Sequence, residues 1–261
     1  MELTILGGSA AAPNPGDACA GYHVASGATA LLLDCGSGVV SRLRALADER
    51  ALSGVVITHL HADHTLDLIA LRYALKYVPA AALPAPIPVH LPPGGLPFLE
   101  RLAGVFQEGN EAGLDFWGDV FAPREYDPAA ALAVGDLTIR FAAMSHYVPV
   151  WAVRVEERRT GKALTFSADT GPQAPLADFA AGSDLLLCEA TLLRQAPGQE
   201  PAAYGHLTAE EAGRIATEAG VKRLVLTHLW AELGFGRYLA DARASFAGPV
   251  DRAEAGARFT I

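Results

Sequence analysis

Three histidines and one aspartate lie within one short segment, directly after an apolar run that ends at Thr58. The segment reads His59-Leu60-His61-Ala62-Asp63-His64. Neutral imidazole nitrogens and carboxylate oxygens are donors that divalent ions such as zinc accept, at about 2.0–2.2 Å. Four such side chains in one tight turn do not converge comfortably on a single ion. We therefore expect His59 with His61, and Asp63 with His64, to serve two ions about 3.5–4 Å apart.

Two ions need further donors, and these follow other apolar runs along the chain. They are His146 after residues 137–145, Asp169 after residues 163–168, and His228 after residues 224–227. A single histidine after a strand is equally well explained as a hydrogen-bonded structural residue. In layered α/β folds, however, functional side chains gather in the loops that follow strand ends, at one edge of the sheet. Four segments with the same placement favour metal binding.

The elements that must position these residues are short strands alternating with helices. Apolar, β-branched runs predict strands at Leu3–Leu6, Ala30–Asp34, Val55–Thr58, Leu137–Ala143, Ala163–Ser167, Leu185–Cys188 and Leu224–Thr227. Helical patterns cover Ser37–Glu49, Thr65–Tyr77 and Thr208–Ala219, the last opened by a capping box of Thr208 and Glu211. The stretch Pro79–Pro97 is rich in proline and is predicted to be a surface connection. The alternation indicates a layered α/β fold.

Composition limits the class of protein. The chain has 261 residues, 51% of them hydrophobic, which is enough for one large domain spanning residues 1–261. A net charge of −9 offers no basic footprint for nucleic acid. Three cysteines without CxxC spacing fit a reducing compartment. Neither a signal peptide nor a membrane-spanning run is recognisable, so we expect a cytoplasmic protein with no membrane partner.

The HxHxDH segment together with the later donors resembles the metallo-β-lactamase superfamily. The resemblance extends to Leu31-Leu32-Leu33-Asp34-Cys35-Gly36, which is similar to that superfamily's first motif and makes Asp34 a candidate residue beside the site. It implies a four-layer αββα sandwich and two metal ions. One ion would be held by His59, His61 and His146, the other by Asp63, His64 and His228, with Asp169 and a hydroxide bridging them.

Such a pair of ions lowers the pKa of the shared water and polarises a substrate oxygen, which implies hydrolysis without a covalent enzyme intermediate. Zinc is the expected metal, and manganese, iron or cobalt suits the same ligands.

Two later motifs are similar to those of the ribonuclease Z branch. Glu189-Ala190-Thr191 and His206-Leu207-Thr208 both lie between Asp169 and His228. The resemblance implies that Glu189 orients His206, and that His206 contacts the scissile phosphate or protonates the leaving oxygen. With Asp63, these two residues are the predicted catalytic residues. Alternatively, His206 merely precedes a helix cap, and neighbouring amides satisfy a buried Glu189.

The chain departs from ribonuclease Z where transfer RNA would bind. Only residues 146–169 are available for a protruding arm, and two strands with a turn at Glu156–Gly161 take up most of them. The early loop Gly7–Pro15 lacks lysine and arginine, which supply most nucleic-acid affinity. The expected substrate is therefore a small phosphodiester, such as a cyclic nucleotide, or a short RNA end, and not transfer RNA.

Two other functions remain open from the sequence. The same metal site could hydrolyse a carbonyl ester, as lactonases and thioesterases of the superfamily do. A protein of another class could keep the metals for a structural or regulatory purpose without turnover. Related proteins are often dimers, so a homodimer is a further expectation.

Overall fold

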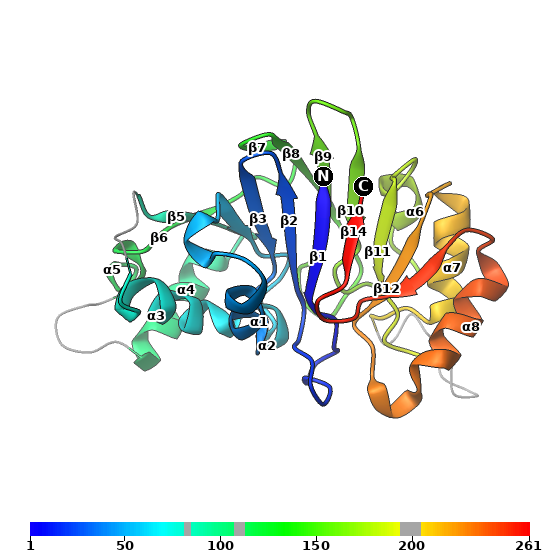
Figure 1. The fold of residues 1–261 in the computed structure, drawn as a ribbon, viewed down its shortest axis with the longest axis horizontal. Coiled ribbons are helices and arrows are strands. Elements are labelled where there is room, and N and C mark those ends of the chain that lie inside the picture. Colours follow the sequence, from blue (N-terminus) through cyan, green and yellow to red (C-terminus); the bar gives the residue numbers. More distant parts are fainter. Residues whose placement is uncertain (81–84, 107–112, 194–204) are drawn as a thin grey trace.

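Two β-sheets lie face to face, and each carries helices on its outer side (Figure 1). The structure is a computed structural model that describes residues 1–80, 85–106, 113–193 and 205–261. Each sheet has seven strands. The layers run helices, sheet, sheet, helices, so the predicted four-layer αββα architecture is confirmed. No described helix is long and apolar enough to cross a bilayer.

The first sheet has the strand order β14-β1-β2-β3-β4-β5-β6. Its strands are β1 Glu2–Gly7, β2 Gly21–Ser26, β3 Thr29–Leu33, β4 Gly54–Val56, β5 Ile87–Leu91, β6 Phe121–Glu125 and β14 Arg258–Thr260. Strands β14, β1, β2 and β3 pair antiparallel, and β3 to β6 pair parallel. The pairing of β1 with β14 brings the two chain ends side by side (Figure 1).

The second sheet has the order β13-β12-β11-β10-β9-β8-β7. Its strands are β7 Leu132–Val134, β8 Leu137–Ala143, β9 Trp151–Glu157, β10 Ala163–Phe166, β11 Leu185–Glu189, β12 Leu224–Thr227 and β13 Val250–Arg252. Strands β7 to β10 are antiparallel and β10 to β13 are parallel. Because β8 and β10 both pair antiparallel with β9, strands β8, β10, β11 and β12 run in one direction and end at the same edge.

The helices belong to two groups, one for each sheet. Helices α1 Val39–Leu46, α2 Ala62–Thr65, α3 Asp67–Tyr77, α4 Gly95–Phe106 and α5 Asp115–Gly118 accompany the first sheet, and α6 Leu176–Phe179, α7 Ala209–Glu218 and α8 Phe235–Ser245 the second (Figure 1). Three apolar cores result: one between the sheets, and one under each group of helices. Central strands such as β3 are buried on both faces, which explains their continuous apolar runs.

Most predicted elements are confirmed, with boundaries shifted by at most three residues. The predicted helix 37–49 is α1 followed by a short 3₁₀ turn at Glu49–Ala51, and the predicted helix 65–77 is α3, preceded by α2. Helix α7 has the predicted capping box, in which the Thr208 hydroxyl accepts from the Glu211 amide and the Glu211 carboxylate accepts from the Thr208 amide.

The prediction of a surface connection over Pro79–Pro97 was wrong for its described part. Strand β5 lies within it, between β4 and β6, and α4 begins at Gly95. The parallel neighbours on both sides complete the backbone hydrogen bonds, and Ile87, Val89 and Leu91 pack into the core under the helices. The flanking prolines are typical of turns, but the segment between them forms a strand because it packs against β4 and β6. Residues 81–84 of the stretch lie outside the described residues.

Candidate metal centre

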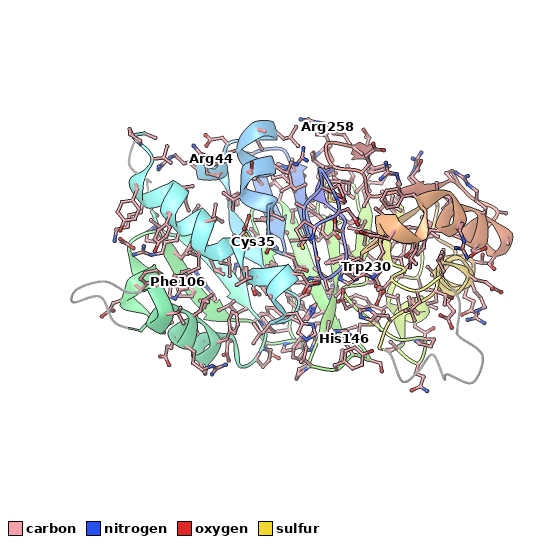
Figure 2. The ribbon with its side chains drawn as sticks, turned by 90° about the horizontal axis from the view of Figure 1, so that it is seen from below. Cys35, Arg44, Phe106, His146, Trp230 and Arg258 are labelled. Carbon is pink, nitrogen blue, oxygen red and sulfur yellow. The ribbon has the colours of Figure 1, made fainter. Side chains whose placement is uncertain are left out.

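Seven imidazole and carboxylate side chains converge at the edge where the strands of both sheets end. The turn after β4 and helix α2 contribute four of them, and the segments after β8, β10 and β12 contribute one each. They are His59, His61, Asp63, His64, His146, Asp169 and His228, and we call them the His/Asp cluster. In Figure 2, which views the molecule from below, His146 and Trp230 both lie about midway along its long axis.

The first group of the cluster consists of three histidines and the shared aspartate. His61 Nδ1 lies 3.1 Å from His59 Nε2 and 3.3 Å from His146 Nε2. Asp169 Oδ2 lies 3.7 Å from His59 Nε2 and 3.8 Å from His146 Nε2. These four donor atoms surround a common point.

The second group shares Asp169 with the first. His228 Nε2 lies 3.1 Å from Asp63 Oδ2 and 3.4 Å from Asp169 Oδ2. His64 Nε2 lies 3.5 Å from Asp63 Oδ2 and 3.4 Å from Asp169 Oδ1. Asp169 is thus the residue that faces both groups, in the division that the sequence resemblance implied.

The donor spacings fit divalent metal ions. Ligands placed tetrahedrally at about 2.1 Å from one zinc ion are about 3.4 Å from one another, close to the separations in both groups. In addition, His64 Nε2 is buried and has no hydrogen-bond partner among the described residues. A buried polar atom without a partner is costly unless something binds it. The cluster is therefore suited to hold metal.

Four of the histidines have their second ring nitrogen held from outside the cluster. His64 Nδ1 lies 2.7 Å from Asp34 Oδ2, and His146 Nδ1 lies 2.8 Å from the Gly205 carbonyl. The corresponding contacts are His228 Nδ1 with Thr191 Oγ1 at 2.7 Å and His59 Nδ1 with Thr58 Oγ1 at 3.1 Å. A proton on each Nδ1 leaves Nε2 as the acceptor that faces the cluster. The interpretation of Asp34 as a residue beside the site is confirmed.

Backbone geometry at three strand ends turns the chain sharply toward the site. Asp34, Ala168 and His228 have φ values of 57°, 51° and 57°. The left-handed region is unfavourable for residues with a Cβ atom, and such strain is concentrated at functional sites. Asp34 comes directly after β3, and His228 comes directly after β12. Ala168 comes directly before Asp169. The strain is therefore located where the cluster is assembled.

Burial determines the protonation of the cluster. Burial lowers the pKa of His59 well below its ordinary value and also lowers the pKa of His146. These rings are neutral at ordinary pH, which is the form that binds a metal. Burial also acts to lower the pKa of His64, but the carboxylates of Asp169 and Asp34 outweigh it and raise that pKa well above its usual range. His64 is therefore protonated when no metal is bound, and a metal ion in the second group would displace this proton.

Glu189 and His206 lie against the second group. Glu189 is the last residue of β11 and is fully buried. Its Oε1 lies 2.9 Å from His206 Nδ1 and accepts from the Thr170 amide at 2.7 Å. The His206 ring stacks on that of His228, with centroids 5.5 Å apart, and is 4.9 Å from the His146 ring. With Nδ1 bound to Glu189, Nε2 is the His206 atom left for a substrate.

The charge of His206 follows from this pairing. Burial alone would lower the pKa of His206, but the Glu189 carboxylate outweighs burial and raises it above its ordinary value. The alternative interpretation of His206 as no more than a residue before a helix cap does not account for its contacts with Glu189 and two cluster histidines.

Sequence reasoning missed three groups that hold the site. The Thr58 hydroxyl, the Thr191 hydroxyl and the Gly205 carbonyl each contact a cluster histidine. Thr58 precedes the first histidine and Thr191 belongs to a recognised motif, so both could have been considered. The Gly205 carbonyl has no signal in the sequence, because any residue carries one.

The segment between His146 and Asp169 is a hairpin. Strand β9, a turn at residues 158–162 and strand β10 occupy most of it, and all of its residues are described. The prediction of a hairpin in place of a protruding arm is confirmed.

Comparison with known proteins agrees with the fold and the cluster. A family profile described as "Beta-lactamase superfamily domain" matches residues 29–229. Ribonuclease Z of Mycobacterium bovis (strain BCG / Pasteur 1173P2) is 32% identical over 269 residues, which cover 96% of this chain and 95% of the relative. The probable metallo-hydrolase YhfI of Bacillus subtilis (strain 168) is 29% identical over 259 residues, which cover 98% of each.

Two solved structures extend the comparison. The crystal structure of YhfI from Bacillus subtilis superposes with a TM-score of 0.85 and 27% identity, and the match covers 99% of each chain. Human tRNase Z, short form, superposes with a TM-score of 0.74 over 100% of this chain and 99% of the other. At 21% sequence identity, the match with human tRNase Z shows a similarity of fold.

The αββα fold and the His/Asp cluster define a hydrolytic enzyme of the metallo-hydrolase class. The chain belongs to the β-lactamase superfamily.

Proposed function

We propose that this enzyme hydrolyses small phosphodiesters with two divalent metal ions held by the His/Asp cluster. The observation that carries the proposal is the position of His206, an imidazole oriented by buried Glu189 at 2.9 Å and stacked beside the cluster. A phosphodiester needs a proton for its leaving oxygen, and His206 Nε2 is the group placed to supply it. The ribonuclease Z relative, matched over nearly its whole length, supports the same chemistry.

His59, His61 and His146 would hold one ion, Asp63, His64 and His228 the other, and Asp169 both. When bound, the two ions supply a hydroxide nucleophile at neutral pH and polarise a phosphoryl oxygen. Zinc suits the nitrogen-rich ligands, and manganese and iron are the alternatives. Asp63 would act in catalysis as a ligand of the second ion, since its Oδ2 lies 3.1 Å from His228 Nε2.

The remaining residues bind and orient. Glu189 accepts the Nδ1 proton of His206 and favours the doubly protonated ring, so that Nε2 carries the proton that the leaving oxygen takes and the ring is left neutral. Glu189 also accepts from the Thr170 amide, next to Asp169. The fully buried Asp34 keeps His64 in the tautomer whose Nε2 faces Asp63 and Asp169.

The substrate we propose is small. The net charge of −9 opposes the approach of a long polyanion, and a hairpin lies where an RNA-binding arm would be. Cyclic nucleotides and short RNA ends satisfy these limits. The three described cysteines are buried free thiols, which supports a location in the reducing cytoplasm.

The test compares a chromogenic phosphodiester, a lactone and a thioester as substrates. The enzyme is depleted of metal and reloaded separately with zinc, manganese or iron, and each preparation is assayed with and without chelator. We expect chelator-sensitive hydrolysis of the phosphodiester, with kcat/KM at least about tenfold above that for either carbonyl ester.

Two preparations control the assay. Asp169→Ala, made in parallel, should be inactive and reveals any contaminating hydrolase. Tyr77→Ala changes an exposed side chain of α3 and should keep wild-type activity. Preference for the lactone or thioester would reject the phosphodiesterase proposal, and a metal-loaded protein inert towards all three would reject it in favour of a non-catalytic metal protein.

A further inference from the structure

Tyr147 exposes its ring to solvent directly beside the His/Asp cluster. The residue follows His146 and is 59% exposed. Its ring centroid lies 4.7 Å from that of His146 and 6.0 Å from that of His206. The ring therefore borders one histidine of the His/Asp cluster and the proposed proton donor His206.

The segment that carries Tyr147 is fixed on both sides. The Met144 amide donates to the Val150 carbonyl at 3.0 Å, which closes the loop between β8 and β9. The Gly171 amide donates to the Ser145 carbonyl at 2.7 Å and ties the loop to the segment after β10. A ring presented by a fixed loop loses little conformational entropy when a ligand covers it.

Gly205 lies close to both His146 and Tyr147. Its φ of 61° is unfavourable for other residues, and a Cβ atom there would lie 3.0 Å from His146 Nδ1 and 3.5 Å from Tyr147 Cζ. The Gly205 carbonyl, in turn, lies 2.8 Å from His146 Nδ1. The backbone at Gly205 thus holds His146 and lies near Tyr147, in the segment that also carries His206.

Core packing does not explain this tyrosine. By contrast, Phe116, Trp117 and Phe121 are at most 2% exposed and pack under the helices. Base–aromatic stacking needs only an accessible ring face and depends little on which base is stacked.

We propose that Tyr147 is a stacking platform for a nucleobase or similar flat ring next to the scissile phosphate, so that the enzyme prefers nucleoside phosphodiesters to alkyl ones. The inference rests on the proposed phosphodiesterase function and adds the residue that would select nucleoside substrates. Tyr147 is a specificity-determining residue, because it would bind the ring of the substrate and takes no part in the bond cleavage.

The test uses two substrates with the same leaving group. Thymidine 5′-(4-nitrophenyl) phosphate carries a nucleoside beside the phosphate, and methyl 4-nitrophenyl phosphate carries a methyl group. Tyr147→Ala should lower kcat/KM for the thymidine diester by about 10-fold or more and leave the methyl diester within twofold. Tyr147→Phe should behave as the wild type, since stacking needs the ring and not the hydroxyl.

A binding measurement separates this proposal from the catalytic one. Metal-loaded Tyr147→Ala should bind thymidine 5′-monophosphate about 10-fold more weakly than the wild type by calorimetry, and inorganic phosphate equally well. Tyr77→Ala is the matched control, because it removes another exposed tyrosine, on α3. Equal losses with both diesters, or unchanged binding of the nucleotide, would overturn the platform. If the wild type hydrolyses neither diester, the proposed function itself fails.

Discussion

Thr191 Oγ1 lies 2.7 Å from His228 Nδ1 and 2.7 Å from Glu189 Oε2. The carboxylate can only accept, so the hydroxyl donates its proton to Glu189 and accepts the Nδ1 proton of His228. One hydroxyl thereby connects the carboxylate that orients His206 with a histidine of the second group. The groups proposed for proton transfer and for metal binding are not independent.

Replacing Thr191 by valine should weaken metal binding. Valine keeps the shape but removes the acceptor for His228 Nδ1 and one donor to Glu189, and the loss of such a supporting contact costs about 10–100-fold in metal affinity. Competition against a chromogenic chelator measures the effect. Thr191→Ser restores the hydroxyl and should recover most of the affinity. Wild-type affinity in the valine variant would show that the contact does not position His228.

Removing Asp169 should abolish binding of both metals, because its carboxylate faces both groups. Removing His146 takes a donor from the first group alone and should empty one site while the other stays filled. Metal-to-protein ratios after dialysis distinguish the variants: near zero for Asp169→Ala and about one for His146→Ala, if the wild type holds two. A wild-type ratio in Asp169→Ala would contradict the shared role of this carboxylate.

His206→Ala should lower kcat by about 10²–10⁴-fold, the usual effect of losing a general acid, with the metal content unchanged. The His206 ring touches cluster histidines but belongs to neither group that shares Asp169. Glu189→Gln keeps the size of the side chain and should give a smaller loss. A substrate whose leaving group needs no proton, such as 4-nitrophenolate, should be the least affected, and a uniform loss across leaving groups would contradict proton donation.

His90 should make the fold less stable in mild acid. It lies in β5, is 3% exposed, and burial, helped by Arg124, lowers its pKa to about 4. In the unfolded chain its pKa is about 6.5. Between these values the unfolded state binds a proton that the folded state does not, so the free energy of unfolding falls as the pH falls from 6.5 to 4.

From pH 7 to pH 5 the contribution of His90 amounts to about 2 kcal/mol. Urea unfolding of the wild type and of His90→Leu at both pH values measures it. The other buried histidines affect both proteins, so the difference between the two pH slopes isolates His90. Parallel slopes would mean that His90 is protonated in the folded state.

Gly36→Ala should disrupt the turn that carries the cluster. A Cβ atom at Gly36 would lie 1.8 Å from the Asp63 carbonyl oxygen, a backbone atom that cannot yield without moving the turn. We expect a loss of about 3 kcal/mol or more, in line with severe overpacking, together with weaker metal binding. Gly104→Ala is the matched control: it lies on exposed α4 with nothing within 4 Å and should stabilise the helix by about 0.5–1 kcal/mol. Equal thermal midpoints for the two variants would refute the argument.

The central elements and the cluster could be predicted because their signals are local. Strand β8, for example, has the predicted limits Leu137–Ala143, and helix α7 follows its capping box. The strands missed, β5 and β14 among them, are short and paired with distant parts of the chain. Their stability comes from neighbours that a local pattern does not contain.

By itself, the sequence determined which donor atoms are available and that four segments deliver them at strand ends. Residue type and spacing are enough for that, because a metal ligand is defined by its chemistry. Only the tertiary structure decided that the Gly205 carbonyl holds His146, that Thr191 connects His228 with Glu189, and that Tyr147 is exposed beside them. These relationships join residues far apart in the chain, and their distances are set by the packing of the two sheets.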